Sequence, residues 1–436
     1  MEKGLKNREE ILNKMGITGL NQMQESTLKE IEKNANLVVL SPTGSGKTLA
    51  FLLPIIEGLN PNITGVQALI VAPSRELAIQ IEQVMRSMGS GYKVNAVYGG
   101  RSSSTDRVEI KTLPAVLIGT PGRLSDHLQT GTVDPSTIKF VVLDEFDKSL
   151  EIGYAQEMEE VFEVLNNLEH RILTSATQKV KIPEYLKMES AKTLDFLNTD
   201  KPSIEILEVH SPEFGREETL FELISEMEGS GIVFCNYNET IQRVHEMFNT
   251  NGVEHSCFYG GLEQIDREKN LVKFRNGTSK VLLATDLAAR GLDIPALDFI
   301  IHFQTPPRPD EFIHRNGRTA RMNAHGKCFV ITGKGASVPS FIKWDGEHKI
   351  KTGVEYTPTL WSTLYLTGGR KDKISKGDIV GFFTKQGGLI ADEIGHIELK
   401  TKSAYIAVPK TKLNQLIHTL NNTKLKTKKV RLSVLD

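Results

Sequence analysis

Few cysteines occur in this sequence, and their number and spacing limit the kinds of protein it can be. The 436 residues include only three, and none has the paired spacing of a disulfide framework or a zinc motif. Five histidines also lack metal-ligand spacing, and we expect them to be structural: His210, His245, His255, His302 and His325. We expect Cys235, Cys257 and Cys328 to pack in the core of a protein from a reducing compartment.

Long apolar runs and an excess of one charge are also missing. The longest apolar stretch, residues 49–56, is far shorter than the about 20 residues of a membrane span, and Pro54 interrupts it. The start, MEKGLKNREE, is too polar for a signal peptide. A net charge of −1 excludes a uniformly basic coat for nucleic acid but leaves local basic patches open. We expect a cytoplasmic protein of about three domains, with no membrane association.

What the sequence does contain is a regular succession of short apolar runs and helix-length amphipathic segments. The runs do not alternate polar and apolar residues, which is typical of parallel strands covered by helices on both faces. A first set comprises residues 37–40, 68–72, 115–119, 140–143 and 171–174. A second set comprises residues 204–209, 231–234, 280–284, 299–303 and 328–332. The pattern predicts two α/β domains, joined at the polar segment 198–203.

A different pattern begins near Thr359. A strand-like run, a basic loop and a helix are followed by two more strand-like runs, a second helix and a last strand. This order predicts a small α+β domain. The predicted domains are therefore residues 1–197, 203–350 and 359–436.

The stretch SPTGSGKT, residues 41–48, follows a predicted strand and precedes a predicted helix. In this setting it is typical of a phosphate-binding loop, whose backbone N–H groups and helix N-terminus bind phosphate oxygens. Lys47 is expected to reach the β- and γ-phosphates, and the Thr48 hydroxyl to bind Mg²⁺. A plain glycine-rich turn is the alternative. The predicted nucleotide-binding residues of the loop are Thr43, Gly44, Ser45, Gly46, Lys47 and Thr48.

Carboxylates follow the apolar run 140–143 directly. Alone, Asp144 and Glu145 would indicate no more than a solvated loop. Combined with Lys47 and Thr48, they indicate a magnesium site, because a phosphate loop needs a carboxylate from a partner strand. We expect Asp144 to hold Mg²⁺ and Glu145 to orient and deprotonate the attacking water.

Over residues 15–335 the chain resembles the DEAD-box RNA helicases. The resemblance rests on Gln24, PSRELA (73–78), Gly99-Gly100, TPGR (120–123), DEFD (144–147), SAT (175–177), VFCN (233–236), ATDLAARGLDIP (284–295) and HRNGRTAR (314–321). It implies two tandem RecA-like domains, ATP and Mg²⁺ as cofactors, and ATP-driven local separation of RNA duplexes.

The resemblance also implies roles for individual residues. Gln24 would read the adenine, Asp293 would contact the ribose, and Arg318 and Arg321 would reach the γ-phosphate as arginine fingers. RNA phosphates and 2′-hydroxyls would be held without sequence readout. The residues expected there are Pro73, Arg75, Gly100, Thr120, Arg123, Thr285 and Arg290.

Three positions depart from the family pattern: Phe146 replaces alanine, Asn316 replaces isoleucine and Ala320 replaces glycine. An aromatic residue expected upstream of Gln24 is also missing. These departures keep open an ATP-gated RNA clamp or chaperone without robust unwinding. A DNA helicase of the same superfamily is a further alternative, which DEFD and the pairing of SAT with HRNGRTAR disfavour.

The last domain contains GGRKDKISKGDIVG (368–381), AYIAVP (404–409) and KLKTKKVRLSVL (424–435). With these segments it resembles the tail domain of the DbpA subfamily, which binds a structured hairpin of large-subunit ribosomal RNA. Residues 363–369 and 403–408 take the places of the signature strands of an RNA-recognition motif, where Tyr365 and Tyr405 would stack on bases or pack in the core. Residues 400–436 contain nine Lys or Arg and one acidic residue. RNA contacts are expected from Arg370, Lys371, Lys428 and Lys429. The resemblance implies a monomer that acts in ribosome assembly.

Overall fold

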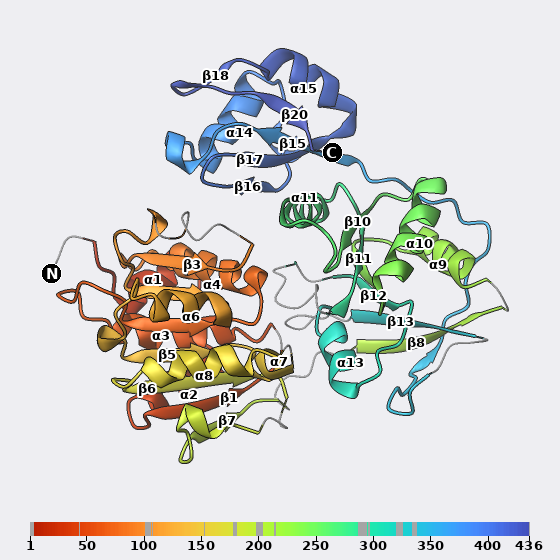
Figure 1. The fold of residues 1–436 in the computed structure, drawn as a ribbon. Helices are drawn as coiled ribbons and strands as arrows, with labels where there is room; N and C mark the ends of the chain where they lie inside the picture. The colour runs from red at the N-terminus through yellow and green to blue at the C-terminus, as the bar shows by residue number, and fades with distance from the viewer. Residues whose placement is uncertain are drawn as a thin grey trace. The chain divides into compact units, whose positions relative to one another are not determined.

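The computed structural model of this chain describes most of its residues. They are residues 4–42, 44–100, 106, 108–151, 153–177, 181–197, 204–212, 215–286, 294, 297–319, 326–333 and 338–435. The described residues up to 197 form one compact unit, and those from 204 onward form a second. Figure 1 labels the helices and strands of both.

The first unit is built on a seven-stranded parallel sheet. Its strands are β1 (Asn36–Leu40), β2 (Ala68–Val71), β3 (Val94–Val97), β4 (Val116–Gly119), β5 (Phe140–Leu143), β6 (His170–Ser175) and β7 (Lys192–Asp195). They lie in the order β3-β4-β2-β5-β6-β1-β7. The predicted first set of strands is confirmed, whereas β3 and β7 were not predicted. The exposed residues of β7 (Lys192 and Thr193) explain its weak signal.

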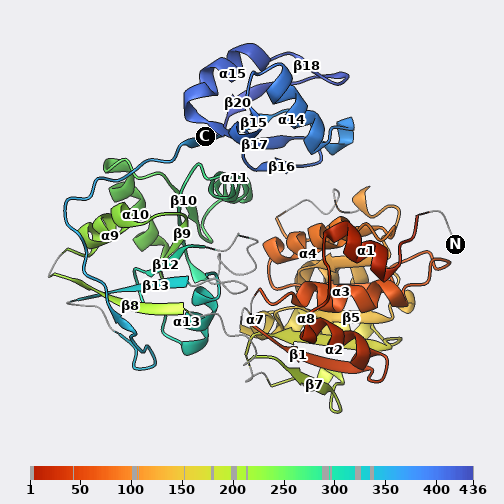
Figure 2. The ribbon, with the colours of Figure 1, turned by 180° about the vertical axis from the view of Figure 1, so that it is seen from behind.

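Helices cover both faces of this sheet. Residues of one face, such as Leu37 and Val39, pack with α1 (Arg8–Met15), α2 (Gln22–Ile31), α3 (Lys47–Gly58) and α4 (Arg75–Met88). Val38 and Leu40 point to the other face, which α6 (Pro121–Gln129) and α8 (Ala155–Val164) cover. Figures 1 and 2 show the two helical layers from opposite sides. The short elements η1 (Pro135–Thr137), α7 (Phe146–Glu151) and η2 (Glu184–Leu186) complete the unit.

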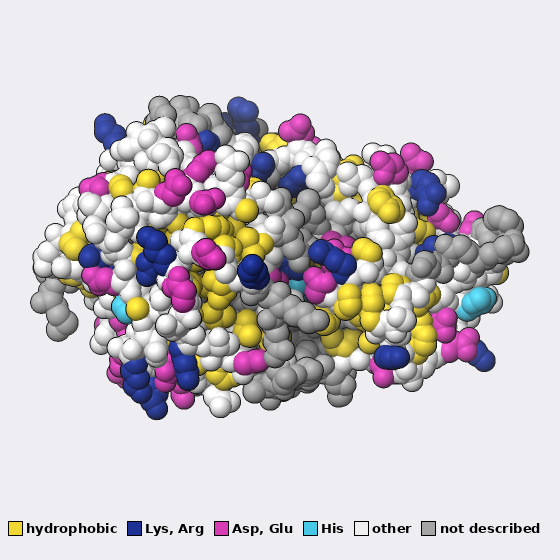
Figure 3. Space-filling view, turned by 60° about the horizontal axis from the view of Figure 1, so that its bottom comes forward, with side chains coloured by type: hydrophobic (Ala, Val, Ile, Leu, Met, Phe, Trp, Pro, Cys, Tyr) yellow, Lys and Arg dark blue, Asp and Glu magenta, His cyan; other side chains and the backbone are white. Residues whose placement is uncertain are grey.

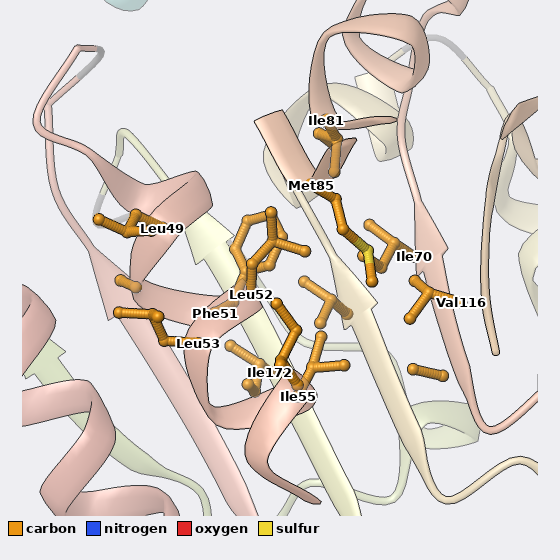
Figure 4. Packing of buried hydrophobic residues seen from close by; sticks show 14 of the residues in the cluster. Leu49, Phe51, Leu52, Leu53, Ile55, Ile70, Ile81, Met85, Val116 and Ile172 are labelled. Atoms are coloured by element: carbon orange, nitrogen blue, oxygen red, sulfur yellow. The ribbon is translucent and has the colours of Figure 1, made fainter. Parts of the chain in front are cut away.

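Helix α3 anchors the first core. Residues 49–56 of this helix are all buried, so it is apolar almost all round, as a helix enclosed by protein requires. Figure 4 shows Leu52 and Ile55 of α3 packed with Ile70 of β2 and Ile172 of β6. The core therefore holds the first turn of α3, where the glycine-rich loop ends.

The second unit contains another seven-stranded parallel sheet. Its strands are β8 (Ile204–Ser211), β9 (Gly231–Phe234), β10 (His255–Phe258), β11 (Val281–Ala284), β12 (Phe299–His302), β13 (Gly326–Gly333) and β14 (Gly346–Glu347), in the order β10-β11-β9-β12-β13-β8-β14. Its helices are α9 (Arg216–Glu226), α10 (Asn238–Thr250), α11 (Gln264–Arg275) and α13 (Pro309–Asn316). This confirms the predicted second set of strands and, with the first sheet, the two tandem RecA-like domains.

A small antiparallel sheet follows in the second unit. It consists of β15 (Trp361–Leu366), β16 (Ile397–Leu399), β17 (Ala404–Pro409) and β20 (Leu432–Val434), in the order β16-β17-β15-β20. Helices α14 (Lys376–Lys385) and α15 (Leu413–Leu420) share its core. The remaining elements are η3 (Arg370–Asp372), η4 (Ala391–Glu393), η5 (Lys410–Lys412) and the hairpin of β18 (Lys424–Leu425) and β19 (Lys428–Lys429). The predicted α+β fold is confirmed; the exact domain boundaries stay predictions.

The molecular surface shows no single charge sign on the face drawn in Figure 3. Acidic and basic side chains are interspersed there with hydrophobic ones, in line with the net charge of −1. Within the part of the chain that the structure describes, no helix has the length and hydropathy to cross a bilayer.

The packing of α3 leads to a stability prediction. We expect Leu52→Ala to lower the free energy of unfolding of the first domain by about 2 to 5 kcal/mol. The Leu52 side chain is 0% exposed, so its truncation leaves a cavity in the core. Hydrogen exchange of the amides in β1 and β2 measures this change. Ile63→Ala, at a residue 36% exposed, is the control and should change exchange little. Equal protection in both variants would contradict the assigned core.

Candidate phosphate and nucleic-acid sites

The strand order of the first sheet brings the predicted site residues to one edge. In a parallel sheet the carboxyl ends of neighbouring strands meet at the same edge. Strands β1, β5 and β6 lie side by side, and they are followed by the glycine-rich loop, DEFD and SAT. Strands β2, β3 and β4 are also neighbours, and they are followed by PSRELA, Gly99-Gly100 and TPGR. The edge therefore has a phosphate-type half and a predicted RNA-type half.

The glycine-rich loop has the backbone conformation that its sequence predicts. Gly44 and Gly46 have φ of 81° and 91°, in the left-handed region that favours glycine. Lys47 is buried in the first turn of α3, and its Nζ donates to the carbonyl oxygens of Ser41 at 2.6 Å and Pro42 at 2.8 Å. The ammonium group is thus held over the loop, where a phosphate would need it. Thr48 follows, half-buried, and Thr43 lies outside the described residues.

Gln24 lies against the same loop. Its Nε2 donates to the carbonyl oxygen of Gly46 at 3.2 Å, and its Oε1 accepts from the backbone N–H of Asn21 at 3.0 Å. The contact is close enough that a Cβ on Gly46 would come within 2.5 Å of the Gln24 Nε2. Both ends of the predicted adenine-reading amide therefore have partners within the protein.

Asp144 lies buried at the end of β5. Its Oδ1 accepts hydrogen bonds from the Thr174 hydroxyl and, at 3.2 Å, from the backbone N–H of Glu145. Burial raises the pKa of the Asp144 carboxyl, while the Thr174 hydrogen bond and the charge of Lys47 oppose the rise. A bound cation would favour the ionised form of the Asp144 carboxyl. A buried carboxylate at this position is therefore suited to bind a metal ion.

Glu145 has an unusual backbone. Its φ of 48° lies in the left-handed region, which costs a residue with a side chain about 1 kcal/mol or more. Two hydrogen bonds from its N–H hold this conformation, to Asp144 Oδ1 and to Thr174 Oγ1 at 3.1 Å. Such outliers gather at functional sites. The observation supports an active role for Glu145.

The SAT segment is tied to the acidic segment. The Ser175 hydroxyl accepts from the Thr177 backbone N–H at 3.0 Å, and the Thr177 hydroxyl lies 3.5 Å from Asp147. Thr174, at the end of β6, bonds to Asp144. A displacement of the SAT segment would therefore disturb hydrogen bonds to the DEFD segment, and the reverse also holds.

Phe146, which replaces the alanine of the family pattern, is buried. The ring is 2% exposed and belongs to the hydrophobic cluster that α6 and α8 form on one face of the first sheet. The larger side chain fills the core of the first domain.

The RNA-type half contains one close arginine–glycine contact. Gly100 has a φ of 84°, and a Cβ built on it would lie 2.3 Å from Nη1 of Arg75. Only glycine lets the guanidinium of Arg75 approach so closely. The structure therefore brings together two predicted RNA contacts from the ends of β2 and β3. Pro73, between β2 and Arg75, is buried.

Arg123, a predicted RNA contact, forms an ion pair within the first domain. Its Nε lies 2.8 Å from Oδ2 of Asp106, and its side chain is only 13% exposed. Asp106 is 0% exposed, so this ion pair is largely removed from water. Thr120, the residue before α6, is also buried. Arg123 Nη1 also lies 3.4 Å from Oδ2 of Asp126, so an RNA contact by Arg123 would have to exchange these protein partners.

In the second domain, a residue without a predicted role connects three motifs. Arg315, within HRNGRTAR, is 1% exposed. Its guanidinium pairs with Asp286 of ATDLAARGLDIP, donates to Asn236 Oδ1 of VFCN at 2.8 Å and donates to the Gln304 carbonyl oxygen at 2.6 Å. It also lies over the Phe234 ring, 5.0 Å from its centroid. The sequence signal for a role of Arg315 was its position inside the HRNGRTAR motif.

Asn316 has polar partners that compensate for its burial. His302 Nε2 lies 2.9 Å from Asn316 Oδ1, and the Cys328 thiol lies 3.2 Å from the same oxygen. An isoleucine there would leave the His302 and Cys328 donors without this acceptor, which explains why the amide is accommodated. Burial, followed by the charge of Arg315, lowers the pKa of His302 to about 3, so its ring is neutral.

The other predicted residues of this domain are described only in part. Thr285, directly after β11, and Arg318, two residues after the end of α13, are buried. Leu297 and Thr319 form a bridge that holds the backbone next to Arg318. Four predicted or departing residues lie outside the described part of the chain: Arg290, Asp293, Ala320 and Arg321.

Two basic segments of the small domain, far apart in sequence, lie together. Lys428 Nζ is 2.8 Å from Asp372 of η3, and Lys426 Nζ donates to the carbonyl oxygen of Lys373 at 2.7 Å. These contacts bring η3 against the hairpin of β18 and β19. We call the resulting surface the basic patch; its exposed members are Arg370, Lys371, Lys373, Lys424, Lys426 and Lys429.

Tyr365 and Tyr405 face each other on β15 and β17. They are paired in the antiparallel register, with ring centroids 5.5 Å apart and planes tilted by 56°. Both are half-buried and neither belongs to the buried core cluster of this domain. The sheet position therefore favours the surface interpretation of these rings over core packing.

Three family models match the chain in succession. DEAD/DEAH box helicase matches residues 21–185, and the helicase conserved C-terminal domain matches residues 215–323. The DbpA RNA binding domain matches residues 363–434. The matches follow the two parallel sheets and the small antiparallel sheet.

Individual proteins are similar over much longer stretches. "ATP-dependent RNA helicase DbpA" of Escherichia coli K12 is 31% identical, over 97% of this chain and 96% of that protein. The protein of the same name from Bacillus subtilis 168 is 28% identical, with the same coverage of both. The structure of S. cerevisiae Dbp5 bound to RNA and ADP BeF3 matches with a TM-score of 0.66 and 26% identity, covering 75% of this chain and 88% of that one.

The contacts of Arg315 lead to a prediction. Arg315→Met should lower the free energy of unfolding of the second parallel-sheet domain by on the order of 3 kcal/mol, because it leaves the Asp286 carboxylate without its charge partner. Urea denaturation measures the change. Arg308→Met breaks an ion pair to Glu311 whose arginine is 46% exposed, and should cost less than about 1 kcal/mol. Similar effects in both variants would refute the central position of Arg315.

His302 should make this domain sensitive to acid. Its pKa is about 3 in the folded domain and about 6.5 when unfolded. Between these values the unfolded chain binds more protons, so stability falls as pH drops through this window. Lowering the pH from 7 to 5 should reduce the free energy of unfolding by about 1 to 2 kcal/mol through this residue. In His302→Gln the pH dependence should be smaller by that amount; an unchanged dependence would contradict it.

Proposed function

The chain belongs to the DEAD-box family of ATP-dependent RNA helicases, in its DbpA subfamily, and from this premise we propose that it separates short RNA duplexes while its small domain holds it on structured large-subunit ribosomal RNA. ATP and RNA together would hold the two RecA-like domains closed, because the closed state makes contacts to both ligands that the open state lacks. Hydrolysis would remove those contacts and reopen the enzyme.

The observation that carries this proposal is the division of one sheet edge. Motif loops of the phosphate-type half follow β1, β5 and β6, and those of the predicted RNA-type half follow β2, β3 and β4. Strands β2 and β5 are paired neighbours, so the two halves adjoin. A change in one half can therefore reach the other through paired backbone.

Lys47, Thr48 and Asp144 would bind the triphosphate and its magnesium ion. Lys47 is held over the loop by two carbonyl oxygens, which a phosphate oxygen would replace with a stronger, charge-assisted contact. A hydroxyl and a carboxylate are the hard oxygen ligands that Mg²⁺ prefers. When bound, Mg²⁺ would supply charge neutralisation between the β- and γ-phosphates.

Glu145 would orient the attacking water and take its proton. The left-handed backbone directs this residue away from the path of a regular strand end, and Asp144 and Thr174 hold it there. Arg318 and Arg321 would stabilise the charge that develops on the γ-phosphate. Asp293 would contact the ribose, and Gln24 the adenine.

The basic patch would supply the affinity for ribosomal RNA. It gathers positive charge from η3 and from the β18–β19 hairpin into one surface, although the whole chain carries a net charge of −1. Tethering by this surface would raise the effective concentration of the helicase near its duplex substrate. The proposed setting is assembly of the large ribosomal subunit by a monomer in the cytoplasm; the three cysteines are buried and unlinked, which suits a reducing compartment.

The alternatives from the sequence are less favoured. Phe146 packs in the core, so it no longer argues for a clamp without unwinding. The curated relatives named above are RNA helicases, and the Dbp5 structure was bound to RNA, which disfavours a DNA enzyme.

The nucleotide assignment is tested by two variants. Glu145→Gln should bind ATP and RNA with unchanged affinity but hydrolyse ATP at least about 100-fold more slowly, because a general base contributes roughly that much. Lys47→Ala should instead weaken ATP binding, since it removes the phosphate contact. Fluorescent nucleotide binding and RNA-stimulated phosphate release separate the two effects. Normal turnover in either variant would refute the role given to that residue.

The tether is tested at the basic patch. Arg370→Ala combined with Lys429→Ala should weaken binding to large-subunit ribosomal RNA fragments, and the slope of log affinity against log salt should fall by about one for each phosphate that the variant no longer neutralises. The control is Lys192→Ala with Lys385→Ala, which removes two exposed charges elsewhere. RNA binding and ATPase stimulation are measured with ribosomal fragments and with unrelated RNA. Equal stimulation by both RNA classes in the unmutated chain would exclude the tether.

A further inference from the structure

Three potential metal ligands from α10 and β10 lie together in the second parallel-sheet domain. His245 Nδ1 is 2.6 Å from His255 Nε2, and the Cys257 Sγ is 3.6 Å from the same His245 nitrogen. All three ligand atoms lie within 4.8 Å of one another. The cluster is at the start of the edge strand β10, whereas the helicase motifs follow the carboxyl ends of the strands.

The imidazole of His255 is oriented as a metal-ligating ring would be. Its Nδ1 lies 2.7 Å from the carbonyl oxygen of Val253, which can only accept, so Nδ1 carries the proton. The lone pair of Nε2 then points to the cluster. A histidine ligand typically donates its second N–H to a carbonyl in this manner, which fixes the ring and its tautomer.

His245 has an equivalent outer partner. The side-chain amide of Asn249, one turn further along α10, lies 3.1 Å from His245 Nε2. Without metal, the 2.6 Å contact to the unprotonated His255 Nε2 needs the proton on His245 Nδ1, and Asn249 donates to His245 Nε2. Metal binding at Nδ1 would move this proton to Nε2, and a flip of the Asn249 amide would then present its oxygen as the acceptor. Both imidazoles thus have a second contact that orients them toward the cluster.

A cavity of about 550 Å³ adjoins the cluster. Its lining includes the three ligand residues and the polar side chains of Asn249 and Asn270. His245 is exposed, so the cavity offers an entry path from solvent and room for a water ligand. Lys273 also lines the cavity, and its positive charge would favour hydroxide or another anion as the remaining ligand.

We propose that His245, His255 and Cys257 bind one zinc ion, with a solvent molecule as the fourth ligand. Two nitrogens and one thiolate are a donor set that zinc accepts in a tetrahedral site. Bond lengths of about 2.0 to 2.3 Å separate such ligands by about 3.3 to 3.8 Å, so the two imidazoles need to open by only about 1 Å. The ion would tie the last turns of α10 to the edge strand.

Cys257 is buried, and it would bind the ion as a thiolate. Zinc deprotonates a thiol that it binds. Three protein ligands with one solvent position describe an exchangeable site rather than a closed structural one. The chain should therefore remain folded when the ion is removed.

The spacing along the chain hid this site. His255 and Cys257 alternate on a strand and so point to one side of the sheet, but they lack the paired spacing of zinc motifs. His245 lies close to them because β10 follows α10 in the chain and packs against it. The expectation that these histidines are structural rested on linear spacing alone.

The test uses the full chain purified without metal. Titration with Zn²⁺ against a chromophoric chelator should show one tightly bound ion per chain. Co²⁺ added alone should give a tetrahedral absorption spectrum with a thiolate-to-cobalt charge-transfer band, a readout that needs no variant. Absence of the band, or of stoichiometric binding, would overturn the proposal.

Variants assign the ligands. Cys257→Ser and His245→Asn should each weaken zinc binding by more than about 100-fold, beyond the 10- to 100-fold that losing an outer partner typically costs. Cys328→Ser and His210→Asn are matched controls outside the cluster and should bind as the unmutated chain does. Because His245 is exposed, its replacement should not impair folding, which circular dichroism checks. Equal affinity in ligand and control variants would exclude the site.

Discussion

Parallel pairing of β5, β6 and β1 is the constraint on which the first domain depends. Their register places the ends of three strands side by side, so that Lys47, Asp144 and Ser175 emerge at one edge. Distant parts of the sequence meet there because helices return the chain to the same end of the sheet after each strand. The buried faces of those helices, above all α3, keep the edge in place. The phosphate chemistry proposed for this edge thus depends on core packing.

The second domain places a buried charge at a comparable junction. Arg315 satisfies a carboxylate, an amide oxygen and a backbone carbonyl from separate strand ends. A buried guanidinium is tolerated only when its donors are paired, so the three segments specify one another's positions. Asn316, next in sequence, repeats the principle with His302 and Cys328. Asn316, which replaces the isoleucine of the family pattern, is therefore one of several neighbouring side chains that satisfy one another's hydrogen bonds.

Much of this could be predicted because strong local signals agree. Apolar runs without alternation indicated the parallel strands. The glycine pattern at 44 and 46 indicated a phosphate-type loop, and both glycines have φ in the left-handed region. Pairings between distant residues could not be predicted. No local pattern announces that Asp106 binds Arg123 or that Phe146 turns into the core, since both depend on how neighbouring helices pack. Strand β7 was not predicted, because it is mostly exposed and lacks an apolar run.

The two hydrogen bonds of Gln24 have a consequence for discrimination among bases. Each atom of this amide keeps a second hydrogen-bonding site, because Nε2 carries two N–H groups and Oε1 has two lone pairs. Gly46 and Asn21 therefore fix the orientation of the amide without using up its capacity. A base presenting a matching acceptor and a matching donor would meet an amide that is already oriented. A base with the reversed pattern could be matched only by rotating the amide, which would break both internal bonds. Selectivity at this position would then arise from that fixed orientation.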